Sequence, residues 1–286
     1  VAVRAVLQIC HGVAEHIARY DGFARALNEQ GIVVAGHDHL GHGKSLPEGG
    51  TPVYFGDGNT WNTVVDDIYV LHQRLKQRYP DVPLCIMGHS MGSFLTRTYL
   101  IRYPGTVKAA VIMGTGWQPR AAITGGLALA NAIAAVSGEN ATSELVTELA
   151  FGSYNKLFAP NRTKVDWLSA DESNVDDYIA DPLCGADATV GLFRQMLHGI
   201  RFNQRQSHLR QMDKQMPVLF VAGDKDPVGS CGKGVRQTYD AFRAAGMRDC
   251  TLKLYPGLRH EILNEKAYTA DITKNIEAWL LSRLEK

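Results

Sequence analysis

Residues 84–92 read LCIMGHSMG, and a run with helical spacing follows without a break. The apolar residues 84–87 are typical of a buried strand. Gly88 and Gly92 lie two positions to either side of Ser90, which gives the pattern G-x-S-x-G. Glycines suit these positions because the serine would sit on a tight strand-to-helix turn, where larger side chains collide with backbone. The pattern predicts a nucleophilic Ser90 beside a helix N-terminus, whose free N–H groups favour a developing negative charge.

Similar apolar runs occur along much of the chain, each followed by a longer segment with helical spacing. This alternation is typical of an α/β protein with a mostly parallel sheet and helices on both faces. Strands this apolar should be buried on both sides. The expected strands are residues 5–10, 32–35, 84–87, 109–113, 218–222 and 251–255, and the expected helices are residues 20–30, 60–79, 91–103, 235–245 and 268–284.

The alternation is interrupted once, between about residues 118 and 215. No strand-like run occurs there, and helical patterns alternate with clusters of Gly, Asn, Pro and Asp. Because connections between neighbouring strands are normally short, a segment of this length predicts an inserted helical subdomain, or cap. The expected division is a core of residues 1–117 and 216–286 and a cap of residues 118–215.

A catalytic serine needs a general base and an acid that orients this base. The strand at 218–222 runs into Gly223-Asp224-Lys225-Asp226, and the last strand ends shortly before His260. Functional residues gather on loops at the carboxyl ends of parallel strands, so His260 is the expected base. Asp224 and Asp226 are both candidates for the acid, although either could be an ordinary turn residue.

Several motifs resemble those of α/β-hydrolase serine hydrolases, in the group that contains monoacylglycerol lipases and bacterial lysophospholipases. The order Ser, Asp, His is the order of this fold. Residues 11–16 (HGVAEH) resemble the group's H-G-x-x-E-H segment, and residues 37–45 (HDHLGHGKS) resemble its D-x-x-G-x-G-x-S turn. Residues 161–166 and 181–183 resemble its cap. The resemblance covers nearly the whole chain and implies the α/β-hydrolase fold, and its G-x-x-D pattern, counted from Gly223, selects Asp226 over Asp224.

The same resemblance implies roles for residues near the first strand. The backbone N–H groups of Val13 and Met91 are expected to form the oxyanion hole. In similar monoacylglycerol lipases, the positions that match Glu15 and Arg19 line the polar end of the pocket. These two residues are therefore expected to bind the alcohol or headgroup of the substrate.

The implied reaction is hydrolysis of a carboxylic ester through an acyl-enzyme on Ser90, with His260 as base and Asp226 as its partner. No cofactor is expected. The expected substrate is a small acyl ester or a monoacyl lipid, such as a monoacylglycerol or a lysophospholipid. Two alternatives remain: a peptidase or amidase of the same fold, which would use the same triad, and a non-catalytic binding protein, which would usually lack one of its members.

Composition narrows the partners and the location. The 286 residues carry 30 Lys and Arg against 29 Asp and Glu, so a basic excess that would hold nucleic acid is missing. Five widely spaced cysteines favour a reducing compartment, and the predicted location is the cytoplasm. The sequence starts at Val1 in a strand-like run, which is compatible with removal of a preceding signal peptide or strands.

The most apolar stretch, residues 121–136, falls short of the ~20 residues that a bilayer crossing needs, so no transmembrane helix is predicted. Apolar residues surround most of this expected helix, which favours packing against the body of the protein. Lining of an acyl tunnel and peripheral contact with lipid through the cap are the alternatives. The residues concerned are Ile123, Leu127, Leu129, Ala130, Ile133 and Val136.

Two further patterns have ordinary explanations. His37, Asp38, His39 and His42 look like metal ligands, but alternate residues of an extended segment point to opposite faces, so no metal site is predicted there. Residues 41–45 (GHGKS) look like a phosphate-binding loop, but that motif would need a glycine where Asp38 stands.

Overall fold

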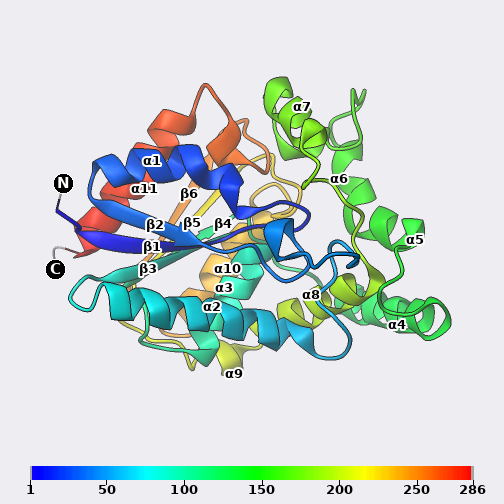
Figure 1. Cartoon of the computed structure of the whole chain (residues 1–286), viewed down its shortest axis with the longest axis horizontal. Helices are drawn as coiled ribbons and strands as arrows, with labels where there is room; N and C mark the ends of the chain where they lie inside the picture. Colours follow the sequence, from blue (N-terminus) through cyan, green and yellow to red (C-terminus); the bar gives the residue numbers. More distant parts are fainter. Residues whose placement is uncertain (1, 285–286) are drawn as a thin grey trace.

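The computed structural model describes residues 2–284 and contains a six-stranded sheet in the order β2-β1-β3-β4-β5-β6 (Figure 1). Every neighbouring pair of strands is parallel. The predicted fold class and all six predicted strands are confirmed, with strand ends that differ by one or two residues. The strands are β1 (Ala5–Cys10), β2 (Ile32–Gly36), β3 (Leu84–His89), β4 (Ala109–Met113), β5 (Val218–Gly223) and β6 (Cys250–Tyr255).

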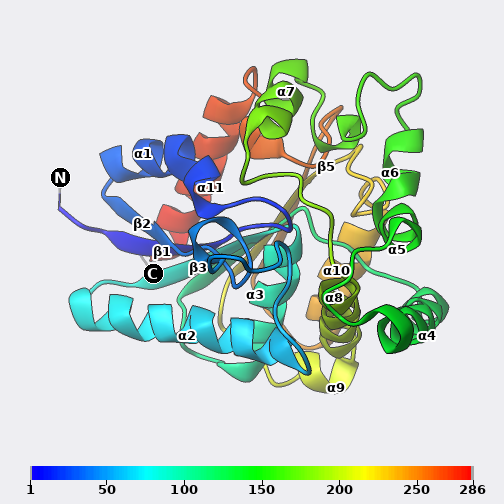
Figure 2. The same cartoon turned by 45° about the vertical axis from the view of Figure 1, so that its right-hand side comes forward.

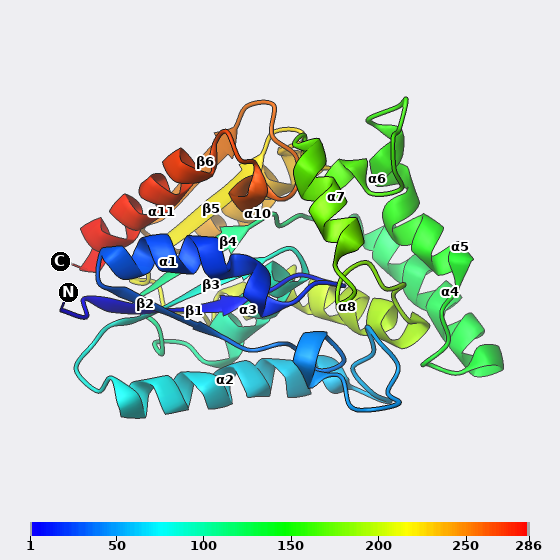
Figure 3. The same ribbon diagram turned by 45° about the horizontal axis from the view of Figure 1, so that its top comes forward.

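Helices cover both faces of this sheet, as predicted. Figures 1 and 3 show α1 and α11 on one side of the sheet and α2 and α3 on the other. The five helices expected outside the insertion are α1 (Asp21–Glu29), α2 (Thr60–Arg78), α3 (Met91–Arg102), α10 (Lys233–Ala244) and α11 (Thr269–Leu284).

The two-residue period of the strands divides the core into two layers. Along β3, Cys85 and Met87 pack with Leu27 of α1 and Ile276 of α11, whereas Ile86 packs on the opposite face with residues of α2 and α3. Burial of each large side chain of this kind contributes roughly 1.5–3 kcal/mol. The layers therefore hold β3 rigidly, and the turn at its end is fixed in place.

Burial of the sheet on both faces holds only for its centre. Every residue of β1, β3, β4 and β5 is buried. Most residues of β2 and β6 are partly exposed, so the expectation of full burial is wrong for these two strands. Each lies at an edge of the sheet and has a neighbouring strand on one side only.

The connection between β4 and β5 is helical and lies beyond the carboxyl ends of the strands (Figure 2). Within the described residues its only β-bridge joins Thr142 to Thr189. The π-helical turn Glu148–Gly152 and the 3₁₀ turn Asp166–Leu168 also belong to this connection. Its α-helices are α4 (Arg120–Ser137), α5 (Glu144–Thr147), α6 (Ser153–Lys156), α7 (Glu172–Ala180), α8 (Val190–Asn203) and α9 (Gln206–Leu209).

Helix α4 contains the most apolar stretch of the sequence. It spans 18 residues with a mean hydropathy of 1.3, and only 17% of these residues are buried, so by length and composition it could cross a membrane. The apolar stretch of residues 121–136 lies within α4, which extends one residue further at each end. Ile123, Leu127 and Ala130 are buried in the core, and α4 packs against α8. One face of α4 is thus held by the protein, as core packing predicted.

Candidate active site

The turn between β3 and α3 places Ser90 in a conformation that non-glycine residues rarely adopt. Its φ and ψ are 55° and −124°, and its backbone N–H donates to the carbonyl of Met113, 3.1 Å away. A Cβ atom on Gly88 would overlap the carbonyl oxygen of Gly92, and one on Gly92 would overlap the carbonyl oxygen of Cys10. Both glycines of the motif are therefore required sterically. Strain of this kind is found mainly at functional sites.

His260 and Asp226 meet at the carboxyl ends of β6 and β5. The Nδ1 atom of His260 is 3.0 Å from Oδ1 of Asp226, and both side chains are buried. The same oxygen accepts the backbone N–H of Val228 at 2.9 Å, which fixes the carboxylate. Asp224, the other candidate acid, accepts instead from the backbone N–H of Gly257 at 2.8 Å. Of the two aspartates, Asp226 is the one that contacts the histidine.

The loop carrying His260 is joined to the serine turn through His89. The imidazole of His89 bonds the carbonyl oxygen of His260 at 3.2 Å, and the two rings are 4.7 Å apart between centroids. No hydrogen bond within the described residues joins the hydroxyl of Ser90 to the ring of His260. Catalytic hydrogen bonds are often long before substrate binds. The structure thus brings His260 into direct contact with Asp226. The hydrogen bond from His89 holds the loop of His260 beside Ser90.

The two backbone groups expected to bind an oxyanion lie on separate loops. Met91 is the first residue of α3, and Val13 follows β1. Neither N–H group donates to another group of the described residues. A Cβ atom on Gly12 would lie only 3.1 Å from Cβ of Ser90, so the loop of Val13 passes close to the serine. Two free donors therefore flank this position.

Glu15 and Arg19 lie in a buried network of charged groups beneath that loop. Glu15 accepts the backbone N–H of Gly12 at 2.5 Å through Oε1 and the guanidinium of Arg19 at 2.8 Å through Oε2. Arg19 also donates two hydrogen bonds, of 2.6 and 2.8 Å, to the carboxylate of Glu261. The side chains of Arg19 and Glu15 are only 10% and 4% exposed, so most of their hydrogen-bonding capacity is used inside the protein.

The charges of this network depend on one another. Burial opposes ionisation of Glu15, but the hydrogen bond with His89 and the charge of Arg19 hold the pKa of its carboxyl well below the usual range. Burial also opposes ionisation of Glu261, but the charge of Arg19 and its hydrogen bonds keep the pKa of this carboxyl below its usual value. One guanidinium therefore stabilises two buried carboxylates, and its removal would leave both without their main counter-charge.

Sequence reasoning missed two residues at the site, Glu261 and Trp167. Glu261 directly follows His260, the expected base. Its charge at that position was the only feature of the sequence that could have pointed to a role at the site. Trp167 belongs to the inserted segment, and its ring lies 5.1 Å from that of His260 between centroids. The backbone N–H of Glu261 donates to the carbonyl of Leu168 at 2.7 Å, which ties the two segments together. The insertion thus contributes one wall around the histidine.

The histidines of residues 37–42 pack ring against ring behind the Val13 loop. His39 lies 4.2 Å from His11 and 5.3 Å from His37 between centroids. Both ring nitrogens of His37 and of His39 are buried without a partner among the described residues. Burial, helped by the charge of His42, lowers the pKa of His11 to about 3, and burial lowers that of His39 well below 6.5. This cluster resists protonation.

Known lipases and esterases resemble this chain over nearly its whole length. The chain is 32% identical to a monoacylglycerol lipase of Mycolicibacterium smegmatis, over 98% of this chain and 89% of that protein. It is 27% identical to the monoglyceride lipase of Mus musculus, over 98% of this chain and 84% of that protein. Among solved structures, a thermostable carboxyl esterase from Bacillus coagulans in complex with glycerol superimposes with a TM-score of 0.92, at 26% identity, over 99% and 91% of the two chains.

A family model described as serine aminopeptidase, S33, matches residues 1–267. Together with the relatives above, this match confirms the resemblance that the motifs at residues 11–16, 37–45 and 88–92 indicated. The chain belongs to this family of α/β-hydrolase serine hydrolases, within the monoglyceride lipase group.

Proposed function

We propose that this protein hydrolyses carboxylic esters of monoacyl lipids, with monoacylglycerols as the leading substrate class. The observation that carries the proposal is the buried hydrogen-bonded pair of His260 and Asp226. The loop of His260 is hydrogen-bonded, through its backbone carbonyl, to His89 beside the strained turn of Ser90. Relatives named monoacylglycerol lipase, and a similar esterase structure that holds glycerol, support the substrate class.

In the proposed reaction, Asp226 accepts a hydrogen bond from Nδ1–H of His260 and so leaves Nε2 free to take the proton of Ser90. The serine oxygen then attacks the ester carbonyl. The N–H groups of Val13 and Met91 stabilise the negative charge that develops on the carbonyl oxygen. His260 gives its proton to the leaving alcohol, and it later activates the water that hydrolyses the acyl-enzyme.

Glu15 and Arg19 are proposed to form the polar end of the substrate pocket. The hydrogen bond from Gly12 to Glu15 connects this network to the loop of Val13. The fit of an alcohol or headgroup would therefore affect the oxyanion loop through one residue. Arg19 would act largely by holding Glu15 and Glu261 in place, since it bonds both carboxylates.

Residues 118–215 are proposed as a cap over this site, above a core of residues 1–117 and 216–286. The contact between Trp167 and His260 supports a role in enclosing the substrate. Peripheral lipid contact through α4, of which only 17% of the residues are buried, is part of the proposal. Cosedimentation with vesicles should then weaken when Val136, which is 87% exposed, is changed to Asp. All five cysteines are free thiols, which fits the proposed cytoplasmic location.

The experiment that tests the function is hydrolysis of nitrophenyl esters from acetyl to palmitoyl, beside monoacylglycerol, lysophosphatidylcholine and an aminoacyl nitroanilide. We expect long acyl esters and monoacylglycerol to be cleaved and Ser90→Ala to abolish turnover. Cleavage of the nitroanilide alone would replace the lipase proposal with the peptidase alternative. No turnover of any substrate would support a non-catalytic binding protein.

A further inference from the structure

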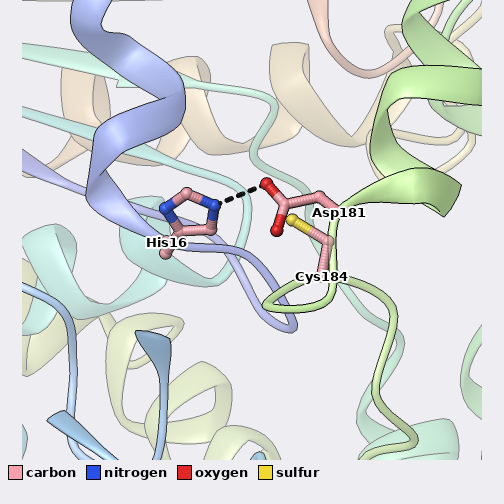
Figure 4. Close-up of side chains that lie close together, drawn as sticks. All are labelled: His16, Asp181 and Cys184. Atoms are coloured by element: carbon pink, nitrogen blue, oxygen red, sulfur yellow. Dashed lines mark hydrogen bonds and ion pairs between the residues drawn. The ribbon is translucent and has the colours of Figure 1, made fainter. Parts of the chain in front are cut away.

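Three side chains from distant parts of the chain gather beside the charged network, without belonging to the proposed triad. They are His16, Asp181 and Cys184 (Figure 4). Their ligand atoms all lie within 4.8 Å of one another, and Nε2 of His16 is 2.8 Å from Oδ2 of Asp181. Within the part of the chain that the structure describes, this is the one cluster of histidine, cysteine and carboxylate with such spacing.

We propose that His16, Asp181 and Cys184 bind one divalent transition-metal ion, with zinc as the representative ion. An imidazole nitrogen, a carboxylate oxygen and a thiolate sulfur are the donors that proteins use for zinc. Three protein ligands would leave one position of a tetrahedral ion for water. Oxygen-preferring ions such as magnesium are disfavoured because two of the three donors are nitrogen and sulfur.

Backbone contacts hold these ligands in place. Oδ1 of Asp181 accepts the backbone N–H of Leu183 at 2.9 Å, so Oδ2 is the oxygen that faces the histidine. The N–H of Cys184 donates to the carbonyl of Asp181 at 3.0 Å, which forms a turn that brings the two side chains to one side. The N–H of Gly185 donates to the carbonyl of Ala14 at 2.9 Å and fastens this turn to the loop of His16. Little rearrangement is therefore needed for chelation.

The local charge also favours a cation. Asp181 stands beside a network in which Glu15 and Glu261 share the single guanidinium of Arg19. Three carboxylates thus stand against one guanidinium. The other basic group of this network is His89, whose pKa burial lowers but the hydrogen bond with Glu15 and its charge raise overall. Arg19 is a cation near Cys184, and its charge is shared between the carboxylates of Glu15 and Glu261.

Binding must displace the proton of the thiol. Burial raises the pKa of Cys184 to about 12, so the free group is a thiol at neutral pH. On binding, a metal–sulfur bond forms and the S–H proton passes to the buffer, while His16 binds through a neutral nitrogen.

Such an ion would join the segment after α7 to the loop that follows Val13. The sequence could not indicate this because His16 and Asp181 are 165 positions apart. The inference does not rest on the proposed function, since none of the three ligands takes part in the proposed reaction.

The test is titration of metal-free protein with Co²⁺, which replaces zinc at such sites and gives a near-ultraviolet thiolate-to-cobalt charge-transfer band. We expect the band to saturate at one equivalent and to vanish on addition of zinc. Cys184→Ser should lose it. Cys231→Ser is the matched control, because Cys231 is an exposed free thiol away from this cluster, and it should keep the band.

Thermal denaturation without metal checks that each variant folds. Asp181→Asn and His16→Gln should weaken cobalt binding, although both variants keep the sulfur ligand of Cys184. A band that is absent from the wild type, that persists in Cys184→Ser or that disappears in Cys231→Ser would overturn the inference. None of these measurements requires esterase activity. The metal site can therefore be tested even if the proposed function is wrong.

Discussion

The Nδ1 atom of His260 lies 3.0 Å from Oδ1 of Asp226, although 34 positions separate the two residues in the chain. They meet because β5 and β6 are adjacent and parallel, so both strands end at the same edge of the sheet. The bond determines which ring nitrogen carries the proton, and this choice decides whether the other nitrogen can act as a base.

The first prediction concerns this bond. Asp226→Asn should lower kcat for a nitrophenyl ester by about 10⁴-fold with little change in KM, because an amide no longer enforces the productive tautomer. Asp224→Asn is the matched control, since Asp224 bonds Gly257 rather than the histidine, and it should keep most of the activity. Equal losses in both variants would mean that the two loops matter only as structure.

The second prediction concerns the backbone donor at Val13. Val13→Pro removes the N–H group and should reduce kcat by at least about 10²–10³-fold, the usual effect of losing one oxyanion donor. Val13→Ala keeps the N–H group and should retain nearly full activity. Steady-state kinetics on one ester distinguish the two, and full activity of the proline variant would remove Val13 from the oxyanion hole.

The third prediction separates substrate binding from chemistry at Arg19. Arg19→Lys keeps the charge between Glu15 and Glu261 but cannot make the paired hydrogen bonds to Glu261. KM should rise more for a glycerol ester than for a nitrophenyl ester, because only the first presents hydroxyl groups to the polar end of the pocket. Arg25→Lys, at an exposed ion pair with Asp21, is the control. Equal changes in KM for both esters would assign Arg19 a purely structural role.

The local part of the site was predictable from sequence, and the part that depends on packing was not. The turn at Ser90 is encoded within residues 84–92, where strand, glycines and helix are consecutive. The choice between Asp224 and Asp226 needed the family resemblance, since both follow β5 and both could form turns. Trp167 and Glu261 reach the site through contacts between distant segments, and no periodicity records such contacts. The two hydrogen bonds from Arg19 to Glu261 could not be predicted from the sequence for the same reason.

The fourth prediction concerns acid stability. The folded pKa values of His11 and His39 lie below the unfolded value of 6.5, that of His11 at about 3, so as the pH falls below 6.5 the unfolded chain binds protons that the folded chain does not. Stability is therefore fully present above pH 6.5 and is lost as the pH falls, by about 1.4 kcal/mol per pH unit for each such histidine. His39→Gln should therefore lose less of its free energy of unfolding between pH 7 and pH 5 than the wild type does. Urea denaturation at both pH values measures this, and identical losses would contradict it.

The last prediction compares two glycines with opposite surroundings. A Cβ atom on Gly92 would overlap the carbonyl oxygen of Cys10, a backbone atom of a buried strand that cannot move aside, so Gly92→Ala should destabilise the protein and abolish turnover. Gly125 lies within α4, and a Cβ atom there would meet nothing within 4 Å. Gly125→Ala should therefore raise the free energy of unfolding by roughly 0.5–1 kcal/mol, because alanine loses less backbone entropy than glycine in a helix. Thermal denaturation and ester hydrolysis of both variants provide the comparison.

Two outcomes would contradict this prediction. An active, stable Gly92→Ala variant would show that the turn at Ser90 is looser than its geometry implies. A destabilised Gly125→Ala variant would show that the exposed face of α4 is covered in solution.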